Sequence, residues 1–512
     1  MVYTRPVPKW DQETEVVVVG YGLAGAVAAI EAHDAGARVL ILEKGVYPGG
    51  LSILAGGGVK CVGDVEGATN YLRITAGGRI DEELIRPFAQ GLSENEEYLK
   101  ELCRINEARL IQRKTVKGLF QGVYPLPGRD SFYVVQVQEI PGFHGFPWVQ
   151  RLRLRGVNLL KLVFDHVEKR GIKVLLSTPA KRLVTDAEGA VTGVVAQNGV
   201  KEITIKASRA VIMATGGFEQ SDWLKKQFLQ GMPFCSMAPL THTGDGIIMT
   251  QKVGAALWHM WHLHGSYGFK LPDFPIAFRH PYAGFRNPQR KMPWIVVDKY
   301  GGRYMNEYQP APQDTMHRAM EVLDPDIPGY SRIPSYLIFD DVGREHGPIA
   351  KPLSLGELVY EWSKDNMQEV ERGWILRAGT IHDLALRIKE TPENQSLMEP
   401  ETLEEGVSSW NNTVDCGQDR LHRLPGTMMP ISTPPFYAIE VWPMITNTQG
   451  GPEHNVRQQV VDALGSPIPH LYAIGELGSF FAHIYELAGN LGECIYSGRV
   501  AGKCAAAEEP LS

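Results

Sequence analysis

Residues 16–25, which read VVVVGYGLAG, decide the fold. Their four consecutive valines are typical of a parallel strand that is buried on both faces. The glycines that follow have the spacing G-x-G-x-x-G. Gly20 permits a tight turn, Gly22 lets a ligand approach the backbone, and Gly25 lets a helix pack closely on the strand. Because the first N–H groups of that helix would face the ligand, the motif predicts a site for a phosphate-bearing molecule.

The residues after this motif complete a βαβ unit. An alanine-rich stretch predicts a helix over residues 26–35, Gly36 ends it, and residues 38–42 predict a second strand. Glu43 follows that strand about 20 residues after the glycines, where a carboxylate can accept hydrogen bonds from ribose hydroxyls. Since strand, glycines, helix, strand and acid occur in this order, we expect a Rossmann-type dinucleotide-binding fold.

Further glycine-rich segments favour a flavin dinucleotide over a nicotinamide one. Residues 48–52 and 55–58 supply a loop that can lie against a pyrophosphate and an isoalloxazine ring, and nicotinamide enzymes do not need such a loop here. Far downstream, the apolar run 210–214 leads into Thr215, Gly216 and Gly217 and predicts another buried strand that brings its backbone to the cofactor. The sequence therefore predicts FAD.

Five segments together resemble the fumarate reductase/succinate dehydrogenase flavoprotein superfamily, in particular its 3-ketosteroid dehydrogenase-like branch. They are residues 16–58, 210–217, 243–246, 296–307 and 450–502, and they are spread over most of the chain. The resemblance implies an α/β fold in which a split Rossmann-type FAD-binding domain holds an inserted α+β capping domain for the substrate. We place the parts of the FAD-binding domain at residues 1–258 and 433–512 and the capping domain at residues 259–432.

Two stretches of the capping domain have helical spacing. Residues 375–389 and 403–413 carry apolar side chains at intervals of three and four, so each predicts a helix.

The resemblance also implies which residues contact FAD, which we expect to be bound non-covalently. Glu476 follows a strand and can bond the ribityl chain. Asn490 and Leu491 stand at the beginning of the last predicted helix, 492–507, whose positive end would stabilise the anionic reduced flavin. The full set of predicted contacts is Gly20, Gly22, Leu23, Ala24, Glu43, Lys44, Gly50, Leu51, Ser52, Gly57, Gly58, Ala180, Thr215, Gly216, Asp245, Gly475, Glu476, Gly489, Asn490 and Leu491.

Superfamily members that reduce fumarate carry three residues that this chain lacks at the matching positions. No arginine follows Asn306-Glu307, no histidine precedes Gly450, and Glu486 stands where a second arginine would hold a carboxylate. A dicarboxylate would lose its bidentate partners and its proton donor together, so fumarate and succinate chemistry is disfavoured.

The ketone-desaturating branch resembles this chain better. There a tyrosine and a backbone N–H hydrogen-bond the substrate carbonyl, and Tyr485 and Gly489 match them. Polarising the carbonyl acidifies the α-carbon, so a base takes its proton while the β-hydride passes to flavin N5. Tyr308 is the first candidate base and Tyr304 the second, and either needs a depressed pKa. We therefore expect an FAD-dependent oxidoreductase that acts on CH–CH groups and desaturates a cyclic ketone.

Two clusters bear on the substrate. Residues 258–264 hold three histidines, but without a carboxylate or cysteine at ligand spacing they predict no metal site, and we place His264 near the substrate. The basic residues of the stretch 279–291 form either a solvated loop or a site for a carboxylate. As a site, they favour a small cyclic keto acid such as 4-oxocyclohexanecarboxylate over a steroid, with Arg286 and Asn447 as the candidate substrate contacts.

Composition and charge exclude other classes. A net charge of −7 gives no basic surface for nucleic acid, and no run reaches the ~18 apolar residues of a membrane span. The six cysteines form no C-x-x-C pair, so zinc and iron–sulfur sites lack their ligand spacing. The first residues show no signal peptide, so we expect a cytoplasmic protein. Its expected partners are the small-molecule substrate and an electron acceptor that the sequence does not identify.

Two alternatives stay open. One is an ene-reductase of the fumarate or urocanate type, because the same groups catalyse both directions. The other is an electron-transfer subunit, which is disfavoured because residues 49–58 hold no histidine for covalent flavin attachment.

Overall fold

The computed structural model describes residues 9–113, 121–149, 155–280, 289–308, 312–355 and 358–511. The chain forms two compact units. Unit 1 consists of Met1–Leu224, Pro239–Leu263 and Asn447–Ser512, and unit 2 of Lys225–Ala238 and His264–Thr446. The domain bounds at residues 258 and 432 stay a prediction. By its contacts the chain enters unit 2 twice, over Lys225–Ala238 and over His264–Thr446.

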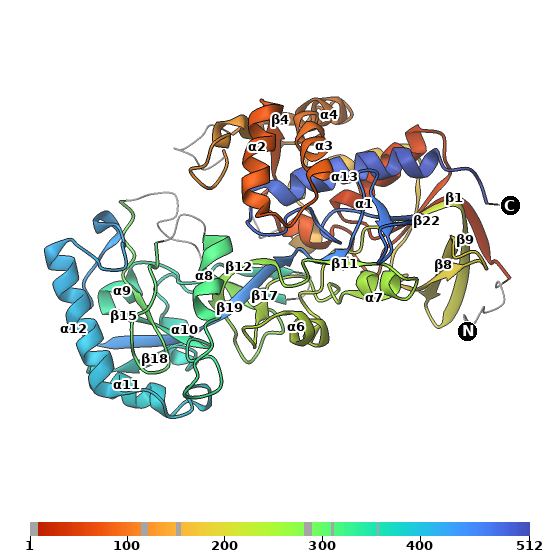
Figure 1. Ribbon diagram of the computed structural model, residues 1–512. Coiled ribbons are helices and arrows are strands. Elements are labelled where there is room, and N and C mark those ends of the chain that lie inside the picture. Colours follow the sequence, from red (N-terminus) through yellow and green to blue (C-terminus); the bar gives the residue numbers. More distant parts are fainter. Residues whose placement is uncertain are drawn as a thin grey trace. The chain divides into compact units, whose positions relative to one another are not determined.

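Unit 1 is built on an eight-stranded sheet with a parallel centre (Figure 1). Strand β1 (Gln12–Val19) pairs in parallel with β2 (Val39–Leu42) and β9 (Lys201–Met213). Val16, Val17 and Val18 are completely buried, as a strand covered on both faces requires. The other strands are β6 (Lys173–Leu175), β7 (Ala180–Thr185), β8 (Val191–Asn198), β21 (Gln459–Val461) and β22 (Pro467–Ala473). The expected α/β, Rossmann-type fold is confirmed.

Two glycine-bearing helices pack against each other in unit 1. Helix α1 (Leu23–Asp34) begins directly after Gly22, and α13 (Gly489–Ala506), drawn in blue, runs beside it (Figure 1). A Cβ atom on Gly498 would lie 2.8 Å from the Ala24 carbonyl oxygen, and one on Gly502 would lie 2.5 Å from that of Ala28. These glycines therefore allow the close approach that brings the first turn of α13 to the carboxyl end of the sheet.

The remaining elements of unit 1 surround this pair. A second sheet consists of β3 (Gly58–Val62), β4 (Arg109–Gln112) and β5 (Phe132–Glu139). A separate two-stranded ribbon consists of β11 (Leu257–Trp258) and β20 (Gly451–Pro452). The helices are α2 (Val65–Ala76), α3 (Glu82–Ser93), α4 (Asn95–Cys103), α5 (Gly156–Lys169) and α7 (Asp245–Gln251), while α6 (Asp222–Phe228) leads into unit 2. Short 3₁₀ helices include Gly50–Leu54.

Unit 2 is built on a seven-stranded sheet around the long strand β19 (Phe436–Thr448) (Figure 1). Its other strands are β10 (Cys235–Ser236), β12 (Leu263–Phe269), β13 (Phe278–Arg279), β14 (Ile295–Val297), β15 (Ser335–Asp340) and β18 (Leu376–Ala378), with a separate hairpin of β16 (Leu353–Leu355) and β17 (Leu358–Tyr360). Its helices are α8 (Pro312–Met320), α9 (Asp341–Glu345), α10 (Met367–Glu371), α11 (Ile381–Lys389) and α12 (Pro400–Cys416).

One helix prediction in unit 2 is wrong in its first part. The predicted helix over residues 375–389 begins only at Ile381, because the Thr380 side chain accepts a hydrogen bond from the Asp383 N–H and caps it there. The residues before this cap form β18, which pairs with β19. The helix predicted over residues 403–413 is the centre of α12.

Among the described residues, no helix combines the length and the apolar character that crossing a membrane requires.

Candidate cofactor site

A cavity of about 860 Å³, part of it open to solvent, lies in unit 1 where β1, β2 and β9 end. This is the edge at which ligands bind in open parallel sheets. Its lining includes these predicted FAD contacts: Gly20, Gly22, Leu23, Ala24, Glu43, Lys44, Gly50, Leu51, Ser52, Ala180, Thr215, Gly216, Asp245 and Glu476.

The three glycines of the first motif serve different purposes. A Cβ atom on Gly20, whose φ is +112°, would lie 2.2 Å from the Ala214 carbonyl oxygen, and one on Gly25 would lie 2.1 Å from that of Gly20. Both positions therefore need glycine for the packing of the protein itself. On Gly22 a Cβ would meet nothing closer than the Gly49 oxygen at 3.8 Å. The protein does not require glycine at Gly22, so the open space there fits a ligand that lies against the backbone.

The first turn of α1 is left open for an anion. Its N-cap is Gly22, which has no side chain to accept a hydrogen bond from the N–H groups, and no acidic residue lies in its first turn. Unpaired N–H groups and the positive end of the helix dipole suit a pyrophosphate.

Glu43 is held in place by backbone donors. Its carboxylate accepts hydrogen bonds from the N–H groups of Tyr21, at 2.8 Å, and of Gly45, at 2.6 Å. Because a carboxylate has about four acceptor positions, acceptor capacity remains for ribose hydroxyls.

Buried polar atoms without partners mark where a polar ligand belongs. Thr215 Oγ1 and Glu476 Oε1, both on residues that line the cavity, are buried and have no hydrogen-bond partner among the described residues. Asn490 Oδ1, in the first turn of α13, is in the same state. Since buried polar atoms are rarely left unpaired, these three atoms fit the hydroxyl and ring groups of FAD.

Lys44 links two loops at the cavity. Its Nζ lies 2.7 Å from the carboxylate of Asp245, which begins α7, and also donates to the Thr241 carbonyl oxygen at 3.2 Å. Both ends of the ion pair are partly exposed, so it orders the loops more than it stabilises the fold.

The remaining predicted FAD contacts do not line the cavity, and their roles stay predictions. Gly57 and Gly475 have packing reasons of their own, because a Cβ on either would lie within 3 Å of the Arg155 backbone or of the Ala24 Cβ, respectively. Gly58 lies near the N-cap of α13, since its Cβ would meet that of Ala488 at 3.5 Å. The others, Gly489, Asn490 and Leu491, form the first turn of α13.

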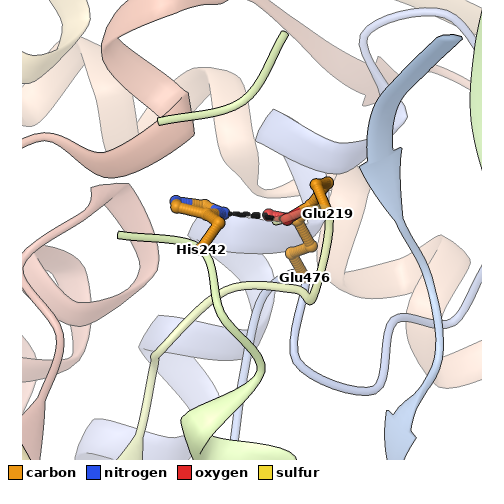
Figure 2. A group of neighbouring side chains, drawn as sticks. All are labelled: Glu219, His242 and Glu476. Carbon is orange, nitrogen blue, oxygen red and sulfur yellow. Dashed lines mark hydrogen bonds and ion pairs between the residues drawn. The ribbon is translucent and has the colours of Figure 1, made fainter. Parts of the chain in front are cut away.

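Glu219, His242 and Glu476 form a cluster at the cavity. The sequence predicted a role for Glu476 but not for Glu219 or His242. Figure 2 shows the three side chains pointing toward one another from three separate segments, and one nitrogen or oxygen atom of each lies within 4.8 Å of the others. His242 Nδ1 lies 3.2 Å from Glu219 Oε2, within hydrogen-bond distance, and 3.9 Å from Glu476 Oε2. His242 and Glu476 also line the cavity. Positions 219, 242 and 476 share no local pattern, so only the fold brings them together.

A second buried network holds the segment that carries Tyr485. The neighbouring Glu486 is completely buried, lies 2.9 Å from Lys60 Nζ and accepts a hydrogen bond from the Tyr71 hydroxyl at 2.6 Å. It also accepts from the Val123 N–H at 3.2 Å. Tyr485 itself is half-buried. Lys60 was not predicted, because a lysine within an apolar strand gives no sign of its partner.

The predicted substrate residues are divided between the units. Tyr485, Gly489 and the buried Asn447 belong to unit 1, whereas Tyr304, Tyr308 and the completely buried His264 belong to unit 2. Arg286 lies outside the described residues.

The two candidate bases have raised pKa values. The Tyr304 hydroxyl donates to Ser335 Oγ at 2.7 Å, and burial raises its pKa; burial also raises the pKa of Tyr308. The structure thus shows no depressed pKa for either tyrosine.

Comparison with known proteins agrees with this site. The model of a family described as FAD binding domain matches residues 15–491. Curated relatives include the 4-oxocyclohexanecarboxylate 2-dehydrogenase of Sinomonas cyclohexanicum, 25% identical over 96% of this chain and 93% of that protein. Another is the urocanate reductase of Eggerthella lenta, 26% identical over 97% of this chain and 75% of that protein.

Solved structures share the fold. A 3-ketosteroid Δ1-dehydrogenase from Sterolibacterium denitrificans, in complex with 1,4-androstadiene-3,17-dione, superposes with a TM-score of 0.78 at 22% identity, covering 97% of this chain and 100% of that one. The resemblance noted in the sequence and the prediction of FAD are confirmed. The chain belongs to the FAD binding domain family and is an FAD-dependent oxidoreductase.

Proposed function

We propose that the protein dehydrogenates a CH–CH bond of a cyclic ketone and forms the α,β-unsaturated ketone. FAD, which we propose is held non-covalently, supplies the acceptor for the hydride that leaves the β-carbon. The residues of this chain would polarise the ketone and remove the α-proton.

Glu486 is the observation that carries the proposal. It stands where fumarate-reducing relatives are expected to have an arginine, and its carboxylate is fully engaged inside the protein by Lys60 and Tyr71. A position occupied by a buried carboxylate offers no cation to a substrate carboxylate. This favours a neutral carbonyl at this end of the substrate.

Tyr485 is the proposed donor to the ketone oxygen. Because Glu486 is anchored on Lys60, the backbone next to it is fixed, and a fixed hydroxyl stabilises a developing enolate oxygen at little reorganisation cost. The other predicted donor, the Gly489 N–H, already donates to the Glu486 carbonyl oxygen at 2.7 Å. The proposal therefore rests on the Tyr485 hydroxyl.

Tyr308 remains the proposed base. The Tyr304 hydroxyl is already donated to Ser335, which leaves Tyr308 as the first candidate. Burial raises the pKa of Tyr308, so this role needs a positive group or a donor near its hydroxyl once substrate is bound.

The substrate we propose is a small cyclic keto acid of the 4-oxocyclohexanecarboxylate type, with a 3-ketosteroid as the other ketone to be tested. The name of the Sinomonas relative supports the keto acid, and the basic stretch 279–291 supplies arginines for its carboxylate. Arg286 and Asn447 stay the proposed substrate contacts, and His264 a proposed neighbour.

Anaerobic mixing tests the proposal. Purified enzyme is mixed without oxygen with 4-oxocyclohexanecarboxylate, with a 3-ketosteroid and, as a matched control, with cyclohexanecarboxylate, which lacks the ketone. We expect the visible flavin absorbance to bleach with a cyclic ketone and not with the control. No bleaching with any ketone, together with rapid oxidation of viologen-reduced enzyme by urocanate or another enoic acid, would establish the ene-reductase direction instead.

A further inference from the structure

We propose that Glu219 and His242 are positioning residues for Glu476, and that they hold one proton on its carboxyl so that Glu476 meets FAD as a neutral group. The inference rests on FAD binding and is independent of the substrate.

Glu219 is surrounded by donors. Its side chain is completely buried, and Oε1 accepts hydrogen bonds from the Thr448 N–H at 2.7 Å and from the Thr448 hydroxyl at 3.1 Å. That hydroxyl accepts from the Phe218 N–H, so its own hydrogen is free to point at Glu219. Oε2 lies 3.2 Å from His242 Nδ1, which donates to it when the imidazole carries a proton on that nitrogen. A carboxyl that meets only donors is stabilised in its ionised, acceptor-only form.

Glu476 is the protonated member of the pair of carboxyls that it forms with Glu219. One carboxyl oxygen of Glu476 and one of Glu219 lie within 4.8 Å of each other, and two buried carboxyls this close keep one proton because both cannot ionise together. Burial and the charge of Glu219 raise the pKa of Glu476 well above its ordinary value. Burial opposes ionisation of Glu219 too, but the hydrogen bond and charge of His242 outweigh it and lower the pKa of that carboxyl.

The glycines after β9 make room for this cluster. A Cβ atom on Gly217 would lie 2.0 Å from Thr448 Oγ1 and 2.4 Å from Glu219 Oε1, and one on Gly216 would lie 2.8 Å from His242 Cε1. The Gly-Gly pair was expected to bring the backbone to the cofactor. The structure gives it a second reason, since any side chain there would break the contacts of Glu219 and His242.

The cluster controls what Glu476 offers the cavity. With its proton directed to Glu219, its remaining oxygen, Oε1, has no partner among the described residues and is a neutral acceptor on the cavity wall. An ionised Glu476 would instead oppose the negative charge of the cofactor. Ionised Glu493 on α13 would further oppose a charge on Glu476, but burial raises the pKa of Glu493 itself to about 8. Of the basic residues that line the cavity, Lys44 is paired with Asp245 and His242 lies beside Glu219.

Infrared spectroscopy detects the proton directly. Redox-induced infrared difference spectra of the wild-type holoenzyme should contain a protonated-carboxyl band that shifts in D₂O and is missing in Glu476→Gln. Glu493 is present in both proteins, so its band cancels in the comparison. If Glu476→Gln instead loses a carboxylate band and no acid band, Glu476 is ionised and the proposal is wrong.

The pH dependence of FAD binding tests the part played by Glu219. In Glu219→Gln the anion that holds the proton is gone, so Glu476 should ionise as the pH rises and FAD should bind about tenfold more weakly at about pH 9 than at about pH 6. The wild-type apoprotein should change by less than about threefold over this range. The double variant Glu219→Gln/Glu476→Gln keeps Glu493 but has neither carboxyl of the pair, so it should lose the pH dependence that the single variant gains. A flat profile in the single variant, or the same slope in both variants, would overturn the inference. Should Glu219→Gln fail to fold, the infrared comparison still decides.

Discussion

The Gly22→Ala substitution should lower the affinity for FAD without lowering the stability of the apoprotein. The residue has φ −87° and ψ −167°, which alanine adopts freely, and the added Cβ would lie 3.8 Å from the Gly49 oxygen and 3.9 Å from Ser52 Oγ. The apoprotein should therefore be as stable as wild type, or more stable by about 0.5 kcal/mol, because alanine restricts the unfolded chain. The same methyl group enters the space for FAD, and overpacking of this kind costs about 1–3 kcal/mol, which is roughly a 5- to 150-fold loss of FAD affinity.

Gly25→Ala is the matched control. Its Cβ would lie 2.1 Å from the Gly20 carbonyl oxygen, which is backbone and cannot move aside easily, so the apoprotein itself should lose on the order of 2–4 kcal/mol. Urea unfolding of both apoproteins and titration with FAD by flavin fluorescence give the two quantities separately. The reasoning is refuted if Gly22→Ala binds FAD as tightly as wild type, or if its apoprotein unfolds as early as that of Gly25→Ala.

Three further outcomes follow from the buried groups and from the proposed donor. Lys60→Met leaves the Glu486 carboxylate buried without its cation, so the free energy of unfolding in urea should fall by about 3–5 kcal/mol. The double variant Lys60→Met/Glu486→Gln should recover part of this loss. Equal stability of the single variant and wild type would contradict the prediction. Burial raises the pKa of Glu493 from 4.5 to about 8, so the folded protein holds a proton that the unfolded chain releases, and stability should fall by up to about 4 kcal/mol as the pH rises from about 5 to about 8. Glu493→Gln should remove this fall, and parallel pH profiles of the two proteins would count against a protonated Glu493. Tyr485→Phe should slow anaerobic flavin bleaching by ketone roughly 100- to 1000-fold while its FAD affinity stays within about twofold of wild type, and near-normal bleaching would exclude the proposed donor role.

The elements around the first motif were predictable because their residues obey local rules. The valines before Gly20 and the glycines after them predict a strand, a turn and a helix within one short stretch, and the structure has β1, α1 and β2 there. Boundaries were less well predicted. The last helix begins at Gly489 and not at residue 492, because Ala488, with φ +65°, supplies a left-handed N-cap that a sequence pattern does not reveal.

The buried polar groups could not be predicted, because their meaning depends on partners far away in the chain. In the sequence, Glu486 indicates only that an arginine is missing at this position. The structure shows its partner Lys60, which lies 426 positions away in the chain. Glu219 follows a Gly-Gly pair and looks like a surface acid, yet it is completely buried against Thr448. Alone, neither position differs from an exposed glutamate, and only the folded contacts assign a charge or a proton to it.

The flavin content of the purified protein tests the central claim most directly. Acid denaturation of the yellow holoprotein should release about one FAD per chain into the supernatant, and the apoprotein should regain the flavin spectrum when FAD is added back. A colourless protein that takes up no FAD would contradict the account of the cavity, and flavin that stays with the precipitated chain would contradict non-covalent binding.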